Sequence, residues 1–379
     1  MYPEAVRRLP VLALALIAAV VAWPSVASAG SYGVVLDDAF AASGTAAWTD
    51  ARQIGVSWVR IDVRWSDVAP AAPTNARLPS GRGYRWGPLD AKVRAAADPA
   101  HPASVLLSVW GTPSWARRDG GAGGEPGNGA FLPKRAHWRN FIAALATRYS
   151  GAYVVNGTTL PRVSAYEIWP NPNLQTGLRP QRLAGRLAAP ALLKGLLAGA
   201  ATEIRAVATA NGFTATLVSG GVARTAPAST TDTPPVAFLR AMARARVQLD
   251  AVGLRLSPPS GVEGAAEAGN LSAADIAAAV ATVDAYWPGQ SRSLWLTGYG
   301  APSGPPETGG SDATQQAAVG VFLAATQNPR VAVGVWDALQ DTDNAPFAGL
   351  RAKAPAPDQT GAPKPAWVTW TTLVPPPPD

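Results

Sequence analysis

The sequence contains no cysteine and only two histidines and two methionines among 379 residues, and charged side chains make up just 15% of it. Without cysteine there is no disulfide scaffold, no thiolate-ligated zinc or iron–sulfur site and no thiol nucleophile. His101 and His137 are too few to build a metal centre, so we expect no metal and no other cofactor. The low charge, with 47% hydrophobic residues and 14 tryptophans, is typical of a globular protein.

Basic residues outnumber acidic residues by seven, but no run of basic residues alternates with aromatic residues. Arginines such as Arg205, Arg240 and Arg244 are scattered among alanines in segments with a helical pattern. This distribution does not favour nucleic-acid binding, and we expect no nucleic-acid partner.

The first 29 residues have the pattern of a secretory signal peptide. Two arginines precede an apolar run over residues 9–22, and residues 27–29 form an Ala-Ser-Ala cleavage pattern before Gly30. The apolar run is shorter than the roughly 20 residues that cross a bilayer. We therefore expect a mature protein that is secreted or associated with the cell envelope, with a membrane contact only if the segment stays uncleaved.

From residue 30 onward, eight runs of β-forming residues alternate with segments of helical periodicity. We expect strands at 32–36, 57–63, 104–109, 164–169, 216–219, 249–256, 293–297 and 331–336, and helices at 46–54, 88–97, 135–149, 190–210, 234–245, 272–286 and 312–326. This alternation predicts a single-domain α/β protein, a (β/α)8 TIM barrel over residues 30–374, followed by a Pro-rich tail at 375–379. A doubly wound open sheet is the alternative, but no strand is followed by its glycine-rich phosphate fingerprint.

Five short motifs carry a resemblance to one enzyme family. They are Val59-Arg60-Ile61-Asp62, Trp65-Ser66-Asp67-Val68, Gly111-Thr112-Pro113-Ser114-Trp115-Ala116, Tyr166-Glu167-Ile168-Trp169 and Lys364-Pro365. The set resembles the secreted clan-A glycoside hydrolases of the β-xylosidase and α-L-iduronidase type found in actinobacteria, and the likeness runs from Tyr32 to Trp370. The resemblance implies a carbohydrate partner, a polysaccharide or glycan, bound in a cleft at the carboxyl ends of the strands.

The same resemblance indicates that the catalytic residues are missing. Retaining glycoside hydrolysis uses two carboxyl groups about 5 to 5.5 Å apart, which the family supplies within a Trp-Asn-Glu-Pro-Asn string after strand four and a Thr-Glu-Phe/Tyr-Gly string at strand seven. Here the two strings read Trp169-Pro170-Asn171-Pro172-Asn173 and Thr297-Gly298-Tyr299-Gly300. Asn171 therefore matches the acid/base position and Gly298 the nucleophile position, which predicts a pseudoenzyme.

A third element of the family's active site is also replaced. The family's His-Pro-Tyr motif after strand six falls on Arg255-Leu256-Ser257. If Arg255 and the glycine-rich loops block the mouth of the barrel, a scaffold function becomes the better interpretation.

Other carboxylates are candidates to replace the lost pair. Asp62 and Asp337 lie at or after the ends of strands two and eight, and Glu307 lies in a loop that could fold back over the cleft. For the two aspartates, solvated loop carboxylates or hydroxyl acceptors are the default explanation.

Two further glutamates are expected to have structural roles. Period-two alternation points Glu167 into the barrel, where we expect a buried ion pair with Arg60. Glu203 is expected on a polar helix face.

Aromatic residues at the strand ends are the candidate carbohydrate contacts. Trp65, Trp115, Trp169, Tyr299 and Trp336 fall at or just beyond predicted strand ends, where rings can stack on sugar faces beside Asn171. Core packing explains these rings equally well. In the family, the tryptophan that Trp336 matches forms the floor of the innermost sugar subsite.

Three functions therefore stay open from the sequence alone. The first is a carbohydrate-binding protein without catalysis, the second an active O-glycoside hydrolase with relocated carboxylates, and the third an envelope or adhesion scaffold with a vestigial cleft. No sequence pattern indicates an oligomeric state.

Overall fold

The computed structural model describes residues 31–119, 130–225, 229–255, 273–287, 292–304, 310–343 and 345–374. Within these ranges, eight parallel strands form a closed barrel. They are β1 (Ser31–Val35), β2 (Val56–Arg64), β3 (Ser104–Trp110), β6 (Ala165–Ile168), β9 (Thr216–Ser219), β11 (Ala251–Arg255), β12 (Ser293–Tyr299) and β13 (Val331–Trp336). Pairing of β13 with β1, and of β9 with β11 through Val218 and Ala251, closes the ring.

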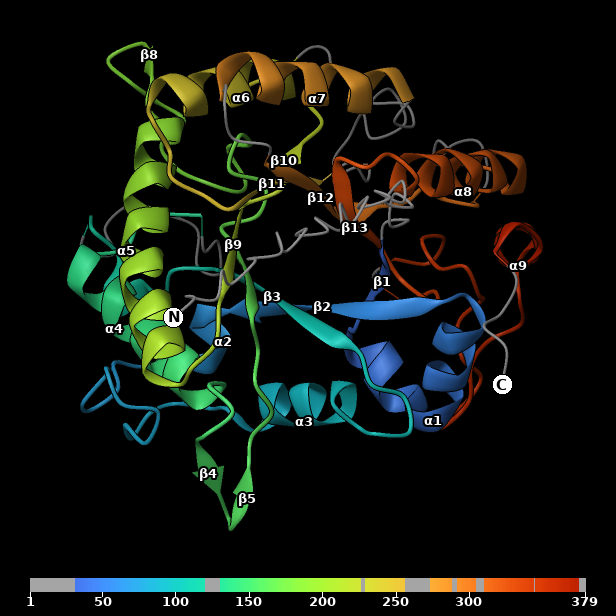
Figure 1. The fold of residues 1–379 in the computed structure, drawn as a ribbon, viewed down its shortest axis with the longest axis horizontal. Coiled ribbons are helices and arrows are strands. Elements are labelled where there is room, and N and C mark those ends of the chain that lie inside the picture. Colours follow the sequence, from blue (N-terminus) through green and yellow to red (C-terminus); the bar gives the residue numbers. More distant parts are fainter. Residues whose placement is uncertain are drawn as a thin grey trace, which may run out of the picture.

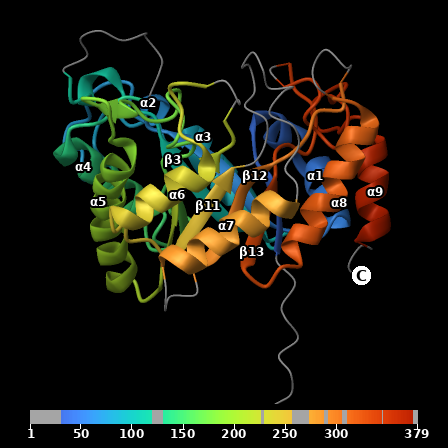
Figure 2. The same ribbon diagram turned by 90° about the horizontal axis from the view of Figure 1, so that it is seen from above.

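Helices surround the strands on the outside (Figure 1). They are α1 (Asp38–Gln53), α3 (Gly87–Ala96), α4 (Arg135–Arg148), α5 (Ala189–Ala210), α6 (Pro235–Arg244), α7 (Ala273–Tyr286), α8 (Asp312–Thr326) and α9 (Pro365–Leu373). Figure 2 shows α5, α6, α7 and α8 side by side in chain order along one side of the barrel. Within the described ranges, no helix combines the length and the apolar character needed to cross a bilayer.

Several short elements lie in the connections between strands and helices. They are α2 (Trp65–Val68), a 3₁₀ turn (Ser114–Ala116), β10 (Val222–Ala223), which pairs with β11, and the two hairpins β4 (Val154–Val155) with β5 (Thr158–Thr159) and β7 (Arg182–Leu183) with β8 (Arg186–Leu187).

The barrel interior is apolar at the amino-terminal end of its strands. Leu106, Ala165, Val218 and neighbouring aliphatic residues pack there, and the rings of Trp58 and Trp295 meet edge to face at 5.0 Å. A second and larger apolar layer fills the space between the strands and the helices. Because side chains fill the interior at the amino-terminal ends of the strands, a ligand can enter the barrel only from the carboxyl ends.

The predicted (β/α)8 barrel is confirmed, since each predicted strand overlaps one barrel strand. Helix α1 begins at Asp38 rather than residue 46, because Asp37 caps it by accepting from the Phe40 amide at 2.7 Å and the helix continues through a kink at Gly44. The predicted signal peptide at residues 1–29 and the tail at 375–379 lie outside the described residues.

Candidate functional site

Charged side chains gather inside the barrel toward the carboxyl ends of its strands. Nε of Arg60, on β2, donates to Oε2 of Glu167, on β6, at 3.0 Å, and both side chains are at most 1% exposed. Nη2 of Arg60 also donates to Oδ1 of Asp62 at 2.7 Å and to Oγ of Ser108 at 2.9 Å. The predicted buried pair between Arg60 and Glu167 is therefore confirmed.

The electrostatic surroundings keep Arg60 charged. Burial opposes the positive charge of the guanidinium, but the nearby carboxylates of Asp62, Glu167 and Asp337 outweigh it and raise the pKa of Arg60 above its ordinary value. Arg60 is thus a permanent cation at the centre of the site.

The second oxygen of Glu167 is also engaged. Oε1 accepts from Oγ1 of Thr297 on β12 at 2.7 Å and from the backbone amide of Gly221 at 2.7 Å. With both oxygens bound and no exposed surface, Glu167 is a structural anion that ties β2, β6 and β12 together.

Asn171 follows β6 in a left-handed backbone conformation, with φ of 54°. Asparagine tolerates this conformation better than most residues do. Its backbone N–H donates to the Gly221 carbonyl at 2.9 Å, and its Oδ1 is buried without a hydrogen-bond partner among the described residues. The position that the resemblance assigns to the acid/base therefore has a fixed backbone and carries a carboxamide side chain.

Gly298, on β12, lies against an ion pair that closes over it. Nη2 of Arg255 donates to Oδ2 of Asp337 at 3.1 Å. A Cβ added to Gly298 would lie 2.9 Å from that oxygen and 3.1 Å from Cγ of Arg255, and real Cβ atoms essentially never approach within 3.0 Å. The pair of Arg255 and Asp337 thus occupies the space into which a side chain at position 298 would extend.

The candidate replacement carboxylates are both held by arginines. Asp337 binds Arg255 with 17% of its side chain exposed, and Asp62 binds Arg60 with 47% exposed. The charge of Asp337 also acts on Arg60, which places both aspartates around the same cation. Glu307 lies outside the described residues.

Four of the five aromatic candidates are core residues. Trp65, Trp169 and Trp336 are 0% exposed and Tyr299 is 1% exposed. A sugar could reach these rings only if the surrounding chain moved, so their burial supports packing as their role. Trp115 is half-buried, and its ring meets His137 edge to face at 5.2 Å.

Several buried polar atoms at this end of the barrel have no hydrogen-bond partner within the described part of the chain. They are Nη1 of Arg60, Oδ1 of Asn171, Nε1 of Trp65 and Nε1 of Trp336. Buried polar groups are nearly always paired, with protein, water or ligand. The rings of Trp65 and Trp336 pack in the layer between the strands and the helices, so only the Arg60 donor and the Asn171 acceptor belong to the charged site.

Sequence analysis did not find the polar partners that complete the site. Ser108 and Thr297 interrupt otherwise apolar strand runs, and that interruption is the signal that could have found them. Nothing in the sequence signals the contact between Arg255 and Asp337, which are 82 residues apart.

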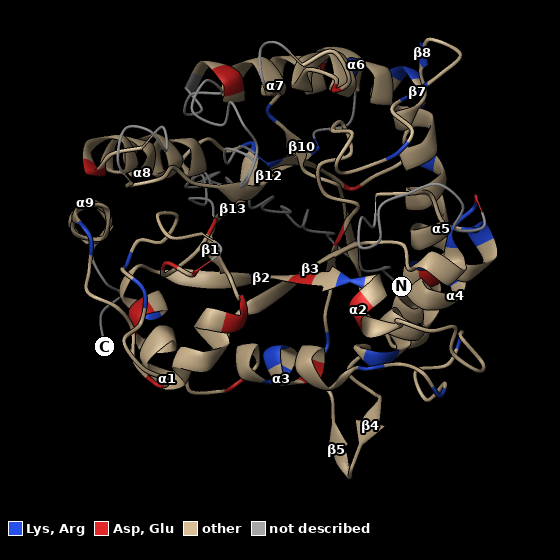
Figure 3. Ribbon diagram, turned by 180° about the vertical axis from the view of Figure 1, so that it is seen from behind, with Lys and Arg blue, Asp and Glu red and all other residues tan. Residues whose placement is uncertain are grey.

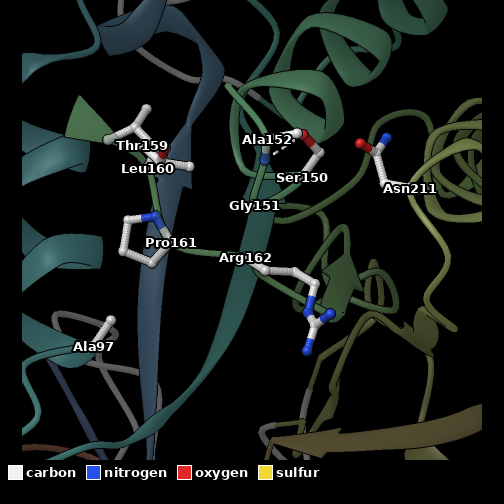
Figure 4. A pocket seen from close by; sticks show the side chains of 9 residues that line it. All are labelled: Ala97, Ser150, Gly151, Ala152, Thr159, Leu160, Pro161, Arg162 and Asn211. Atoms are coloured by element: carbon white, nitrogen blue, oxygen red, sulfur yellow. Dashed lines mark hydrogen bonds between the residues drawn. The ribbon is translucent and has the colours of Figure 1, made fainter. Parts of the chain in front are cut away.

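A pocket of about 510 Å³ opens at the opposite end of the barrel (Figure 4). Its lining includes Ser150, Arg162 and Asn211, which lie in connections that lead from helices into strands. None of its lining side chains is a buried polar group without a partner. This pocket is separate from the charged site and carries no catalytic group among its lining residues.

Within the described ranges there is also no cluster of three or more side chains able to hold a metal ion.

The sequence matches no protein-family model and no curated protein. Solved structures resemble the fold. A family 39 glycoside hydrolase from Bacteroides cellulosilyticus WH2 shares 18% identity at a TM-score of 0.55, with 91% of this chain and 64% of that chain covered. A monomeric β-xylosidase from Caulobacter crescentus CB15 shares 16% identity at a TM-score of 0.57, with coverages of 91% and 68%.

An intracellular xylanase from Thermoanaerobacterium saccharolyticum shares 12% identity at a TM-score of 0.53, with 90% of this chain and 95% of that chain covered. This chain therefore spans only about two thirds of the length of the first two structures but nearly all of the xylanase. The similarities establish the class of the fold, the (β/α)8 barrel that glycoside hydrolases use. A shared fold does not by itself assign an activity.

Proposed function

We propose that this protein is a secreted, glycoside hydrolase-like protein that binds a glycan at the barrel mouth without hydrolysing it. The loss of hydrolysis is supported by the ion pair of Arg255 and Asp337, which fills the space beside Gly298. A retaining mechanism requires a free carboxylate there that can attack the anomeric carbon. A carboxylate bound to a guanidinium is a poorer nucleophile, because the ion pair stabilises its negative charge.

The amide at Asn171 supports the same conclusion for the proton-transfer step. A carboxamide does not donate or accept a proton in the pH range of folded proteins, so it cannot protonate the leaving oxygen. General acid–base catalysis contributes about 10²- to 10⁴-fold to enzymatic rates, and the covalent route is lost together with the nucleophile.

Binding is supported by two polar atoms at the strand ends that have no hydrogen-bond partner among the described residues. A sugar hydroxyl both donates and accepts hydrogen bonds, and these atoms are a donor, Nη1 of Arg60, and an acceptor, Oδ1 of Asn171. Secretion is supported by the charged, apolar and small-residue order of residues 1–29.

Hydrolysis and binding are tested on the mature protein. Release of aryl groups from aryl glycosides is measured with and without azide, and binding of neutral xylo- and cello-oligosaccharides is measured by calorimetry. We expect saturable binding and no release. Asn171→Ala, which removes the unpaired acceptor, is expected to weaken binding while circular dichroism stays unchanged.

A variant with restored carboxylates calibrates the hydrolysis assay. Because the pair of Arg255 and Asp337 fills the space, the variant combines Asn171→Glu and Gly298→Glu with Asp337→Ala. Turnover by the natural sequence at the rate of this variant would overturn the proposal. Absence of both turnover and binding would favour the scaffold.

A second candidate, an active hydrolase, is favoured by the position of Asp337. Its Oδ2 lies 2.9 Å from where a Cβ of Gly298 would be, close to the place of the lost nucleophile. If the natural sequence releases aryl groups and Asp337→Asn abolishes the release, this candidate replaces the first. Asp62→Asn tests the second aspartate in the same way.

A further inference from the structure

The positive charge of this protein is concentrated in one segment. Residues 117–194 contain 11 basic and 3 acidic side chains, whereas the other 301 residues contain 21 basic and 22 acidic ones. The whole excess of positive charge therefore comes from a segment that forms α4, β6, the hairpin of β7 and β8, and the first turns of α5.

Part of this charge is neutralised within the fold. Arg117, Arg139 and Arg148 form ion pairs with Asp119, Glu203 and Asp90. Seven others are exposed and form no ion pair with any residue that the structure describes. One of them, Arg162, lies just before β6, at the opposite end of the barrel. The remaining six are Arg118, Lys134, Arg135, Arg182, Arg186 and Lys194, and we call them the basic rim.

The basic rim lies at the same end of the barrel as the charged site. Its residues come from the connection after β3, the start of α4, the hairpin after β6 and the second turn of α5, and these connections follow the carboxyl ends of parallel strands. Figure 3 shows the Lys and Arg segments of α4, α5, β7 and β8 along one side of the molecule.

One hydrogen bond and one shared aromatic ring join the two connections that carry much of the basic rim. The Arg179 amide donates to the Ala130 carbonyl at 2.8 Å, which links the connection after β6 to the one after β3. The guanidinium groups of Arg117 and Arg179 both lie over the ring of Phe131, at 3.7 and 5.3 Å from its centroid. The rim is therefore carried on a connected surface rather than on independent loops.

We propose that the basic rim binds an anionic polysaccharide, whose chain crosses the rim on its way to the barrel mouth. The proposal rests on the proposed function, since it identifies the charge of the glycan that the same face takes. Six cations at one edge, none of them in an ion pair with a described residue, create a positive potential that attracts an anionic polymer. A polysaccharide that is bound at the barrel mouth has to extend outward across some part of the barrel edge. The proposed function gives no reason for a nucleic acid to lie there, so we favour an anionic polysaccharide.

The test compares two polymers that differ only in charge. Retention of the full mature protein on immobilised dextran sulfate and on unmodified dextran is measured from 50 mM to 500 mM salt. We expect binding to dextran sulfate that weakens as salt rises, because the contacts are exposed and screened. The variant Lys134→Glu/Arg135→Glu/Arg182→Glu/Arg186→Glu is expected to bind about tenfold or more weakly at low salt.

A matched variant controls for net charge. Arg52, Arg162, Arg244 and Arg246 are exposed, form no ion pair with a described residue and lie near the helix ends that lead into strands, at the end of the barrel opposite the basic rim. Changing these four to Glu lowers the net charge by the same amount and is expected to leave most of the binding. Equal losses in the two variants, or no binding of dextran sulfate by the natural sequence at 50 mM salt, would overturn the proposal.

Two further arms separate the alternatives. Tighter binding of single-stranded oligodeoxythymidylate than of dextran sulfate would assign the basic rim to nucleic acid instead. Calorimetry with neutral oligosaccharides reports on the mouth alone. Binding of neutral oligosaccharides without binding of dextran sulfate rejects the role of the basic rim and leaves the proposed function. Binding of dextran sulfate without binding of neutral oligosaccharides rejects the proposed function, and with it the path to the barrel mouth, and leaves anion binding by the rim.

Discussion

At the scale of single residues, two carboxylates bind the same guanidinium but differ in their exposure to solvent. Glu167 and Asp62 both bind Arg60, but Glu167 is 0% exposed and Asp62 is 47% exposed. Glu167→Gln leaves a buried cation without its buried counterion, so we expect a loss of about 3 to 5 kcal/mol in the free energy of unfolding. Urea denaturation followed by fluorescence measures it.

Asp62→Asn is the matched control for that prediction. The Asp62 carboxylate is half exposed, so its removal is expected to cost less than about 1 kcal/mol. Similar small losses in both variants would mean that Glu167 does not hold the strands together.

Glu203 is buried by a distant loop, which the helical pattern of the sequence does not predict. The helical pattern predicted a polar face, but the side chain is 2% exposed and is bound by Arg77 and Arg139. The prediction of a polar face was wrong, because the loop that carries Arg77 folds over the helix from 126 residues away. Helical periodicity reports which side of a helix is polar and says nothing of what later covers it.

The contacts of Glu203 predict a pH dependence. Burial raises the pKa of this carboxyl, but the hydrogen bonds from Arg77 and Arg139 outweigh it and hold the pKa below its ordinary value of 4.5. The unfolded chain therefore binds the proton more readily, so the pairs stabilise the fold above that value and lose their effect as the pH falls through the lowered pKa.

We expect Glu203→Gln to lower the free energy of unfolding by about 1 to 3 kcal/mol at pH 7. The difference from the natural sequence should shrink toward pH 3, and thermal unfolding across pH measures it. Asp284→Asn, which removes the carboxylate of an exposed pair with Arg330, should change stability little at any pH. A Glu203→Gln effect that is independent of pH would contradict this account.

At the scale of elements, strand β12 has to run close to the residue that follows β13. A Cβ at Gly298 would lie 2.9 Å from Oδ2 of Asp337, whereas a Cβ at Gly300 would lie no closer than 3.6 Å to any atom. We therefore expect Gly298→Ala to lower stability by about 1 to 3 kcal/mol through overpacking, and Gly300→Ala to cost much less.

A double-mutant cycle identifies the cause of that loss. Asp337→Ala removes the atom that the new methyl group would meet, so the Gly298→Ala penalty should largely disappear in that background. An undiminished penalty would show that the clash lies elsewhere.

The regular elements could be predicted from the sequence and the irregular ones could not. The eight strands alternate with helices of clear periodicity, and that alternation predicts the barrel. Helix α9 was missed because Trp, Val and Thr in its sequence favour strands. Packing decides its structure instead, since Trp370 is buried and its Nε1 donates to the Ile54 carbonyl at 3.0 Å.

At the scale of the whole molecule, barrel closure creates the contacts that define the candidate site. Arg60 and Glu167 are 107 residues apart, and Arg255 and Asp337 are 82 apart. The first pair could be predicted because strand alternation points both side chains into the barrel. The second could not, because both residues lie at strand ends, where alternation no longer fixes the direction of a side chain.

The last whole-molecule prediction concerns the signal peptide that the sequence predicts at residues 1–29. Cleavage after Ala29 would remove two arginines and one glutamate and leave a mature chain of net charge +6 beginning at Gly30. Signal peptidases require small residues one and three positions before the cut, and Ala29 and Ala27 occupy these positions. Ala27→Glu/Ala29→Glu should therefore keep the protein at its full mass in the membrane fraction.

Ser28→Glu is the matched control, because the position between the two alanines tolerates larger side chains. This variant should be released and cut like the natural sequence, and intact-mass measurement of cell and culture fractions distinguishes the two outcomes. A natural protein that retains Met1 and stays inside the cell would contradict both the leader and the extracellular glycan that it implies. The ligand of the barrel mouth would then have to be a molecule found in the cytoplasm.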